Sequence, residues 1–171
     1  PAKPIVVRAT CRSAQAGADR GEAYRLTVGD EGVRIDADGP TGVLRAYASL
    51  RQLAGLSPAG IAIAHQTISD APRFAWRGIM LDPARHFISV ATLKRQIDAM
   101  ERLKFNTLHL HLSDDQGFRV ESLRYPKLNA DGEYYRQSEV RDLVAYAADR
   151  GIRIVPEFDV PGHSRAIVTA Y

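Results

Sequence analysis

Carboxylates and imidazoles occur at short spacings in two stretches of the second half of the chain. In "IVPEFDVPGH", Glu157 and Asp159 lie two residues apart and would share one face of a strand, with Cβ atoms about 7 Å apart. Two carboxyl groups at that spacing could act as the acid and base of a glycosidase. In "LHLHL", His109 and His111 alternate in the same way. A His-x-His pair can bind a metal ion, but no matching carboxylates or cysteines accompany it, so we interpret both as interior residues with satisfied hydrogen bonds.

Polar residues also follow the end of each segment that is predicted to be a strand in this half. The pairs are Asp82 with Arg85, Asp114 with Asp115, and Asp159 with His163. In folds with parallel strands, the carboxyl ends of the strands carry the functional site. We interpret the charged residues of "DPARHF" as a buried ionic network beneath such a site, rather than as ligand contacts.

The elements that must position these residues alternate between strand and helix over residues 73–171. Near-continuous apolar runs predict strands, and apolar residues spaced by about 3.6 predict helices. The residues expected to face inward are Leu93, Ile97, Met100 and Leu103 in the first helix, and Val140, Leu143, Val144 and Ala147 in the second. Parallel crossovers are implied. The predicted strands are 74–82, 105–112 and 152–163, and the predicted helices are 89–105 and 138–151.

Residues 1–72 have a different pattern and read as a small α+β domain. The turn "GDEG" joins two alternating runs and predicts a hairpin. The following helix is predicted to bury Val43, Leu44, Tyr47 and Leu50. Nothing in this segment gathers acids or histidines into a site. The predicted elements are strands at 5–11 and 60–72, a hairpin at 24–38 and a helix at 39–56.

Composition excludes several classes of protein. With 45% hydrophobic and 25% charged residues in 171, the chain is typical of a globular protein, and no apolar run approaches the roughly 20 residues of a membrane span. The 23 basic and 20 acidic residues are interspersed, so we expect neither a nucleic-acid nor a membrane partner. The single Cys11 excludes an internal disulfide. Three strands fall short of a closed barrel of eight, which takes about 250 residues, so we expect a fragment or one piece of a protein.

Four blocks of the second half resemble the β-N-acetylhexosaminidases of glycoside hydrolase family 20. They are "WRGIMLDPARHF" (76–87), "FNTLHLHLSDDQGFR" (105–119), "YPKL" (125–128) and "GIRIVPEFDVPGH" (151–163). Residues 1–72 look like the small α+β domain that precedes the barrel in that family. The resemblance therefore implies an α/β chain, in which this small domain is followed by the first three βα units of an incomplete (β/α)8 TIM barrel, residues 73–171.

This resemblance also implies an activity. The family removes terminal β-linked N-acetylglucosamine or N-acetylgalactosamine with retention of configuration, using the substrate's own 2-acetamido oxygen as nucleophile and no metal or other cofactor. An Asp-Glu pair orients the acetamido group and protonates the leaving oxygen. The only adjacent Asp-Glu here is Asp30-Glu31, in the predicted hairpin turn. We therefore expect the chain alone to be inactive, with the remaining C-terminal part of the barrel as a partner.

Individual roles follow from the same resemblance. Arg77 is expected to bind the sugar hydroxyls, because a guanidinium can hold two oxygens at once. Asp114 is expected to hold His163, which would in turn contact the general acid, and Asp159 is expected to support this network. Asp115 is expected to cap the turn or bind a backbone N–H.

Two other functions remain open at this stage. A chain that lacks the acid pair could be a non-catalytic sugar-binding or interaction module, or a barrel glycosidase that uses Glu157 and Asp159 directly. The ligand that the family resemblance implies is an oligosaccharide or glycoconjugate with a terminal β-linked N-acetylhexosamine. Export to the periplasm or the outside of the cell is favoured over the cytoplasm, because the family is often exported.

Overall fold

The chain folds into two compact units. A computed structural model describes residues 6–13, 21–58 and 60–171. Unit 1 comprises Pro1–Trp76 together with Glu101–Lys104, and unit 2 comprises Arg77–Met100 and Phe105–Tyr171. The main division thus falls between residues 76 and 77, four residues after the boundary predicted from the sequence.

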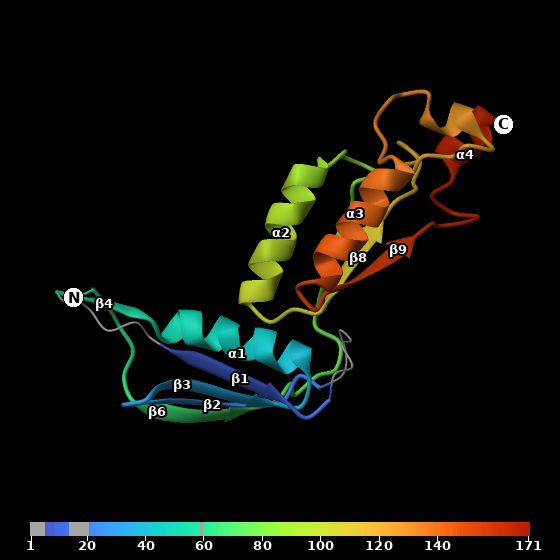
Figure 1. Ribbon diagram of the computed structural model, residues 1–171. Helices are drawn as coiled ribbons and strands as arrows, with labels where there is room; N and C mark the ends of the chain where they lie inside the picture. The colour runs from blue at the N-terminus through green and yellow to red at the C-terminus, as the bar shows by residue number, and fades with distance from the viewer. Residues whose placement is uncertain (1–5, 14–20, 59) are drawn as a thin grey trace. The chain divides into compact units, whose positions relative to one another are not determined.

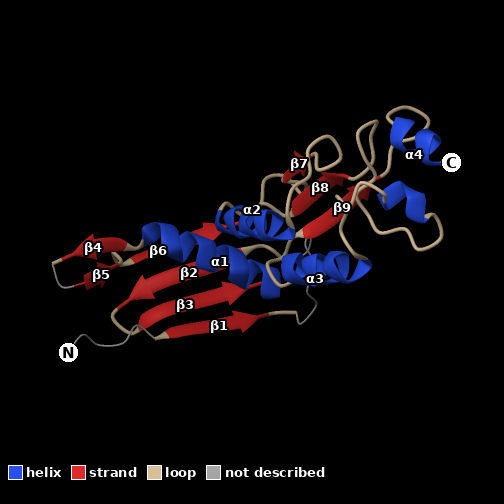
Figure 2. Ribbon diagram, turned by 90° about the horizontal axis from the view of Figure 1, so that it is seen from above, coloured by secondary structure: helices blue, strands red, loops and turns tan. Residues whose placement is uncertain are grey.

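Unit 1 is a four-stranded sheet with one long helix packed on a single face. Its strands lie side by side in the order β1-β3-β2-β6, with β1 parallel to β3 and the other pairs antiparallel (Figure 2). The predicted strand at its start begins at residue 5, which lies outside the described residues. The elements are β1 (Val7–Cys11), β2 (Tyr24–Gly29), β3 (Gly32–Ala37), α1 (Pro40–Leu53), the short pair β4 (Gly55–Ser57) and β5 (Gly60–Ala62), and β6 (Gln66–Asp70).

The predicted hairpin is confirmed as β2 and β3, which pair antiparallel with Val28 opposite Val33. Period-two alternation puts the apolar side chains of both strands on the α1 side, where Leu26 and Ile35 are fully buried. Gly32 has φ of 110°, a conformation that a side chain would strain, and a Cβ there would also meet the Val6 carbonyl oxygen.

Helix α1 follows the predicted stripe only in part. Leu50 is buried and Val43 packs against the same core, but Tyr47 is 39% exposed. Arg45, which was not predicted to be buried, is 2% exposed, and its Nε lies 2.6 Å from Oε2 of the buried Glu22. The ion pair allows both charges to leave water.

Unit 2 contains three parallel strands in the order β7-β8-β9, with α2 and α3 lying side by side over one face (Figure 1). A continuous core of buried aliphatic residues joins the two helices to β8. Strand and helix alternate as predicted. The elements are β7 (Gly78–Leu81), α2 (Val90–Arg102), β8 (Thr107–His111), the 3-10 helix η1 (Pro126–Asn129), α3 (Gln137–Ala148), β9 (Arg153–Glu157) and α4 (Arg165–Ala170).

The inward faces of the helices in unit 2 follow most of the predicted spacing. Leu93, Ile97 and Met100 of α2 are at most 1% exposed. The prediction is wrong for Leu103, which follows the end of α2 and is 67% exposed, and for Val144 of α3, which is 46% exposed. Strand β7 is shorter than predicted, since residues 74–77 are not part of it. None of the helices in the described part of the chain is long and apolar enough to cross a membrane.

Candidate active site

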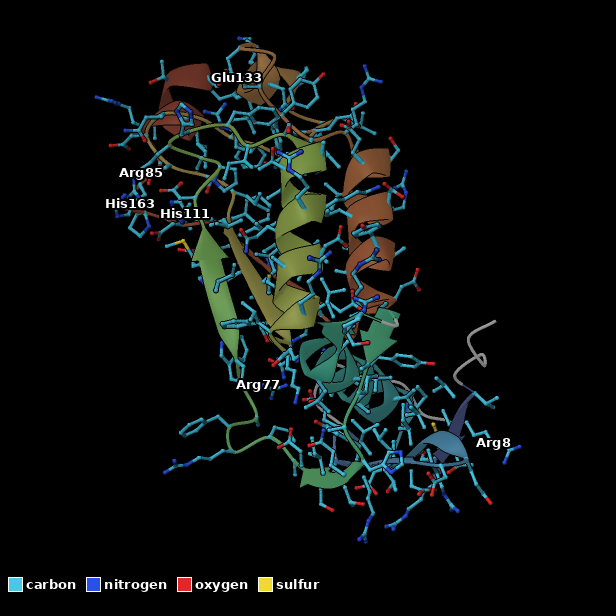
Figure 3. All side chains as sticks on the ribbon, turned by 90° about the vertical axis from the view of Figure 1, so that its left-hand side faces the viewer. Arg8, Arg77, Arg85, His111, Glu133 and His163 are labelled. Atoms are coloured by element: carbon cyan, nitrogen blue, oxygen red, sulfur yellow. The ribbon has the colours of Figure 1, made fainter. Side chains whose placement is uncertain are left out.

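A cluster of titratable residues of unit 2 lies at the carboxyl ends of its strands. Figure 3 shows Arg85, His111 and His163 together at this end, whereas Arg77 lies at the opposite end of β7. Asp114 follows β8 in the sequence, and Glu157 is the last residue of β9. Because the three strands are parallel, residues as far apart in the sequence as Arg85 and His163 come to one edge of the sheet.

Asp114 is the centre of this site. Its side chain is 2% exposed, and each of its carboxylate oxygens contacts two other groups. Oδ1 accepts from the backbone N–H of Asp115 at 2.6 Å and lies 3.2 Å from His163 Nδ1. Oδ2 lies 2.9 Å from His111 Nε2 and 2.8 Å from the Arg85 guanidinium. One carboxylate therefore binds four groups that come from three separate segments of the chain.

These contacts hold Asp114 ionised. Burial alone would raise the pKa of its carboxyl group, but the hydrogen bonds from Asp115, His111 and His163 and the charge of Arg85 outweigh it and lower the pKa to about 2. At neutral pH the side chain is thus a carboxylate that can only accept hydrogen bonds.

The turn that presents Asp114 is fixed by the buried Arg119. The Asp114 backbone N–H donates to the carbonyl of Gly117 at 3.0 Å. The guanidinium of Arg119, 3% exposed, donates to the carbonyls of Pro83 and Ala84 in the loop after β7. A Cβ on Gly117 would lie 2.2 Å from the Arg119 guanidinium carbon, so a side chain there would displace the guanidinium from its hydrogen bonds. Arg119 thereby ties the loop of Arg85 to the turn of Asp114, a role that sequence analysis missed.

The structure brings His163 to Asp114, as the resemblance implied. His163 has φ of 52°, in the left-handed region that is unfavourable by about 1–2 kcal/mol for a residue with a side chain. This backbone conformation places Nδ1 on Asp114, while the side chain remains 50% exposed. Asp114 can therefore orient the imidazole, whose other nitrogen is left to face a ligand or another catalytic group.

Arg77 is not brought to this site, which corrects the expectation that it binds the same ligand as Asp114 and His163. Its backbone N–H and carbonyl pair with Asn106 at the start of β7, before the first residue of the strand. At a rise of roughly 3.3 Å per residue, the four residues of β7 separate it from the carboxyl edge by about 13 Å.

Arg85 is the arginine that the fold places at the carboxyl edge. Its guanidinium contacts both Asp82 and Asp114, yet its side chain is 47% exposed. The predicted buried network of "DPARHF" is therefore wrong in one respect, because Arg85 and His86 are exposed to solvent. The sequence does contain a signal for Arg85. Asp82 is the first residue after β7, and Arg85 is only three residues further on, so it had to lie near the carboxyl end of that strand.

Asp159 does not join the network. Its backbone N–H donates to Ser113 Oγ at 3.1 Å, and within the described residues its carboxylate makes no hydrogen bond with Asp114 or His163. Asp115, as predicted, accepts a backbone N–H, that of Arg165, at 3.0 Å.

Both carboxylate oxygens of Glu157 are engaged by the two histidines of β8. Its Oε2 lies 2.5 Å from His109 Nε2 and its Oε1 lies 3.1 Å from His111 Nδ1. Burial raises the pKa of Glu157, but the hydrogen bonds and charges of His111 and His109 lower it overall. A carboxyl with a lowered pKa is a poor proton donor at neutral pH, which argues against Glu157 as the general acid of a glycosidase.

Comparison with known proteins identifies both segments. The family model described as "Glycosyl hydrolase family 20, catalytic domain" matches residues 74–171, and the one described as "Glycosyl hydrolase family 20, domain 2" matches residues 2–71. A beta-hexosaminidase of Akkermansia muciniphila is 45% identical over 169 residues, which cover 88% of this chain and 34% of that protein. A beta-N-acetylhexosaminidase of Cellulomonas fimi is 42% identical over 161 residues, covering 88% and 32%.

Solved structures agree with this comparison. A chitobiase of Flavobacterium johnsoniae superposes with a TM-score of 0.92 at 44% identity, covering 96% of this chain and 26% of that one. An exo-β-N-acetylglucosaminidase of Vibrio harveyi, solved with N-acetylglucosamine, gives 0.84 at 38% identity, covering 97% and 29%. The chain thus spans about a third or less of these relatives, and unit 2 corresponds to part of a TIM barrel. The chain belongs to glycosyl hydrolase family 20.

Proposed function

We propose that the protein is an exo-β-N-acetylhexosaminidase, which removes a terminal β-linked N-acetylglucosamine or N-acetylgalactosamine from an oligosaccharide or glycoconjugate. The names of its relatives support this activity. The observation that carries the proposal is the buried Asp114 carboxylate, which holds Arg85 and His163 at the carboxyl edge of the strands, the edge that carries the active site in barrel enzymes.

The chemistry divides between this chain and residues outside it. Asp114 fixes His163, which can then adjust the proton affinity of a neighbouring general acid. The Asp-Glu pair that would orient the acetamido group and protonate the leaving oxygen is to be sought outside these 171 residues. The only adjacent Asp-Glu in the sequence, Asp30-Glu31, lies exposed in the turn between β2 and β3 of unit 1.

The decisive experiment compares two chromogenic substrates of the complete protein. A β-N-acetylglucosaminide should be hydrolysed with retention of configuration, whereas the matching β-glucoside, which lacks the acetamido nucleophile, should react at least about 10³-fold more slowly. Comparable rates on both substrates would contradict a mechanism assisted by the substrate. The 171-residue chain alone should not turn over either compound. Tight binding of N-acetylglucosamine by the complete protein with no turnover would instead support a sugar-binding module.

The placement of the two arginines leads to a prediction about substrate binding. Arg85→Ala should raise KM on the order of 10²-fold, because two hydrogen bonds from a guanidinium to sugar hydroxyls are each worth roughly tenfold. Arg77→Ala, at the opposite end of β7, is the matched comparison and should leave KM within about twofold. Steady-state kinetics of both variants decide the matter. A large rise in KM for Arg77→Ala with none for Arg85→Ala would restore the assignment made from the sequence.

A further inference from the structure

Glu157 lies between two histidines, and both of its carboxylate oxygens are used. It is the cross-strand neighbour of His111 on β8, and His109 is on the same face two residues earlier. His109 Nε2 lies 2.5 Å from Oε2 and His111 Nδ1 lies 3.1 Å from Oε1. The strand pairing therefore builds this contact directly into the sheet.

His111 has a carboxylate on each of its ring nitrogens. Nδ1 faces Glu157 at 3.1 Å and Nε2 faces Asp114 at 2.9 Å, and the side chain is only 6% exposed. A neutral imidazole carries a single N–H, so it can donate to only one of two ionised carboxylates. Both contacts are hydrogen bonds only when the ring is an imidazolium.

The charges around His111 favour this protonated form. Glu157 of β9, Asp114 after β8 and Asp82 after β7 are the acidic groups, and the pKa of each is lowered, so all three are ionised at neutral pH. The basic groups nearby are Arg85, whose guanidinium contacts Asp82 and Asp114, His109 on Glu157, and His163, whose ring centroid lies 6.1 Å from that of His111. Burial lowers the pKa of His111, but its hydrogen bonds to Asp114 and Glu157 and the charges of Glu157 and Asp82 raise it overall.

We propose that Glu157 is a positioning residue, which holds His111 as an imidazolium and so keeps a fixed positive charge against the Oδ2 atom of Asp114. With Oδ2 occupied by His111 and Arg85, only Oδ1 of Asp114 is directed at His163. The consequence for catalysis rests on the proposed hexosaminidase function, whereas the protonation state of His111 does not.

Replacing Glu157 should weaken the hold of the site on the His111 proton. In Glu157→Gln, His111 loses one of its two carboxylates and should release its proton at lower pH. Above that pH, Asp114 loses the cation that lies 2.9 Å from its Oδ2 atom.

The test is a pH titration of the ring nitrogens by NMR in protein with ¹⁵N-labelled histidine, whose five imidazoles can be assigned by single substitutions. In the native protein, His111 should carry both N–H groups at neutral pH and should lose one only above the ordinary histidine pKa of about 6.5. In Glu157→Gln, the pKa of His111 should fall. Asp142→Asn, which removes an equal charge from the exposed face of α3, should leave the pKa of His111 unchanged.

If Glu157→Gln fails to fold, the titration of His111 in the native protein still tests the proposal. A native His111 that loses a proton near pH 6.5, or that carries one N–H at neutral pH, would overturn it. So would a folded Glu157→Gln in which His111 titrates as before. Glu157→Asp, which keeps the charge, should leave His111 protonated. In the complete enzyme, Glu157→Gln should change the pH dependence of kcat, whereas Glu157→Asp should not. Absence of hydrolysis by the native enzyme would refute the proposed function but leave the NMR result standing.

Discussion

Asp114→Asn should lower kcat of the complete enzyme on the order of 10³-fold, the largest effect on activity expected from any single change in this site. An amide has one acceptor oxygen and one donor NH2 group, whereas the carboxylate accepts on both sides. In one orientation the NH2 group faces His163 and the Asp115 N–H, and in the other it faces His111 and Arg85. Either way, two donors of the site lose their acceptor, and the remaining groups lose the charge that orders them.

The neighbouring residue supplies a matched control for this prediction. Asp115→Asn changes the same functional group one position away, but its oxygen can still accept the backbone N–H of Arg165, so kcat should remain within about threefold. Separate values of kcat and KM on a chromogenic N-acetylglucosaminide, with circular dichroism to verify folding, give the comparison. A kcat of a folded Asp114→Asn variant within threefold of the native value would show that this carboxylate does not organise the site.

Arg45→Ala should lower the free energy of unfolding of unit 1 by about 3–5 kcal/mol, the largest effect on stability expected from the described contacts. The guanidinium is 2% exposed and lies 2.6 Å from Glu22, which is 3% exposed. Removing it leaves a buried carboxylate without its cationic partner, and the loss of packing between α1 and the sheet adds to this cost. Denaturant unfolding, together with amide hydrogen exchange of α1 and β2, would assign the change to unit 1.

Two further variants test whether the loss of stability comes from the unpaired buried charge of Glu22. The double change Glu22→Leu with Arg45→Met replaces the ion pair by apolar groups and should recover most of the lost stability. Arg34→Ala, which removes an exposed ion pair with Asp36 on the other face of the same sheet, should have no measurable effect. A loss below about 1 kcal/mol in Arg45→Ala would mean that water or another side chain compensates Glu22.

The sequence was sufficient to predict the order of the elements and one contact of the site. Alternation in β2 and β3 and the 3.6-residue spacing of Leu93, Ile97 and Met100 follow from local geometry, so they can be read without a structure. The contact between Asp114 and His163 was implied by the family resemblance of two separate blocks, "SDD" and "PGH".

The helix α1 shows where local pattern fails. Its apolar spacing predicted Tyr47 in the core, but Arg45 is buried instead. The reason lies in Glu22, 23 residues earlier in the chain, because a buried cation is stable only where a partner from another segment is already present. No pattern within the helix contains that information.

The sequence by itself therefore determined which segments are strands and helices, and that polar residues would collect where the parallel strands end. Only the tertiary structure decided which polar side chains meet there: Arg85 in place of Arg77, and Glu157 with His109 and His111 in place of Asp159. The physical reason is that a contact across a sheet depends on strand register and on which end of each strand a residue occupies. These are set by hydrogen bonds between segments far apart in the sequence, such as those that pair His111 with Glu157.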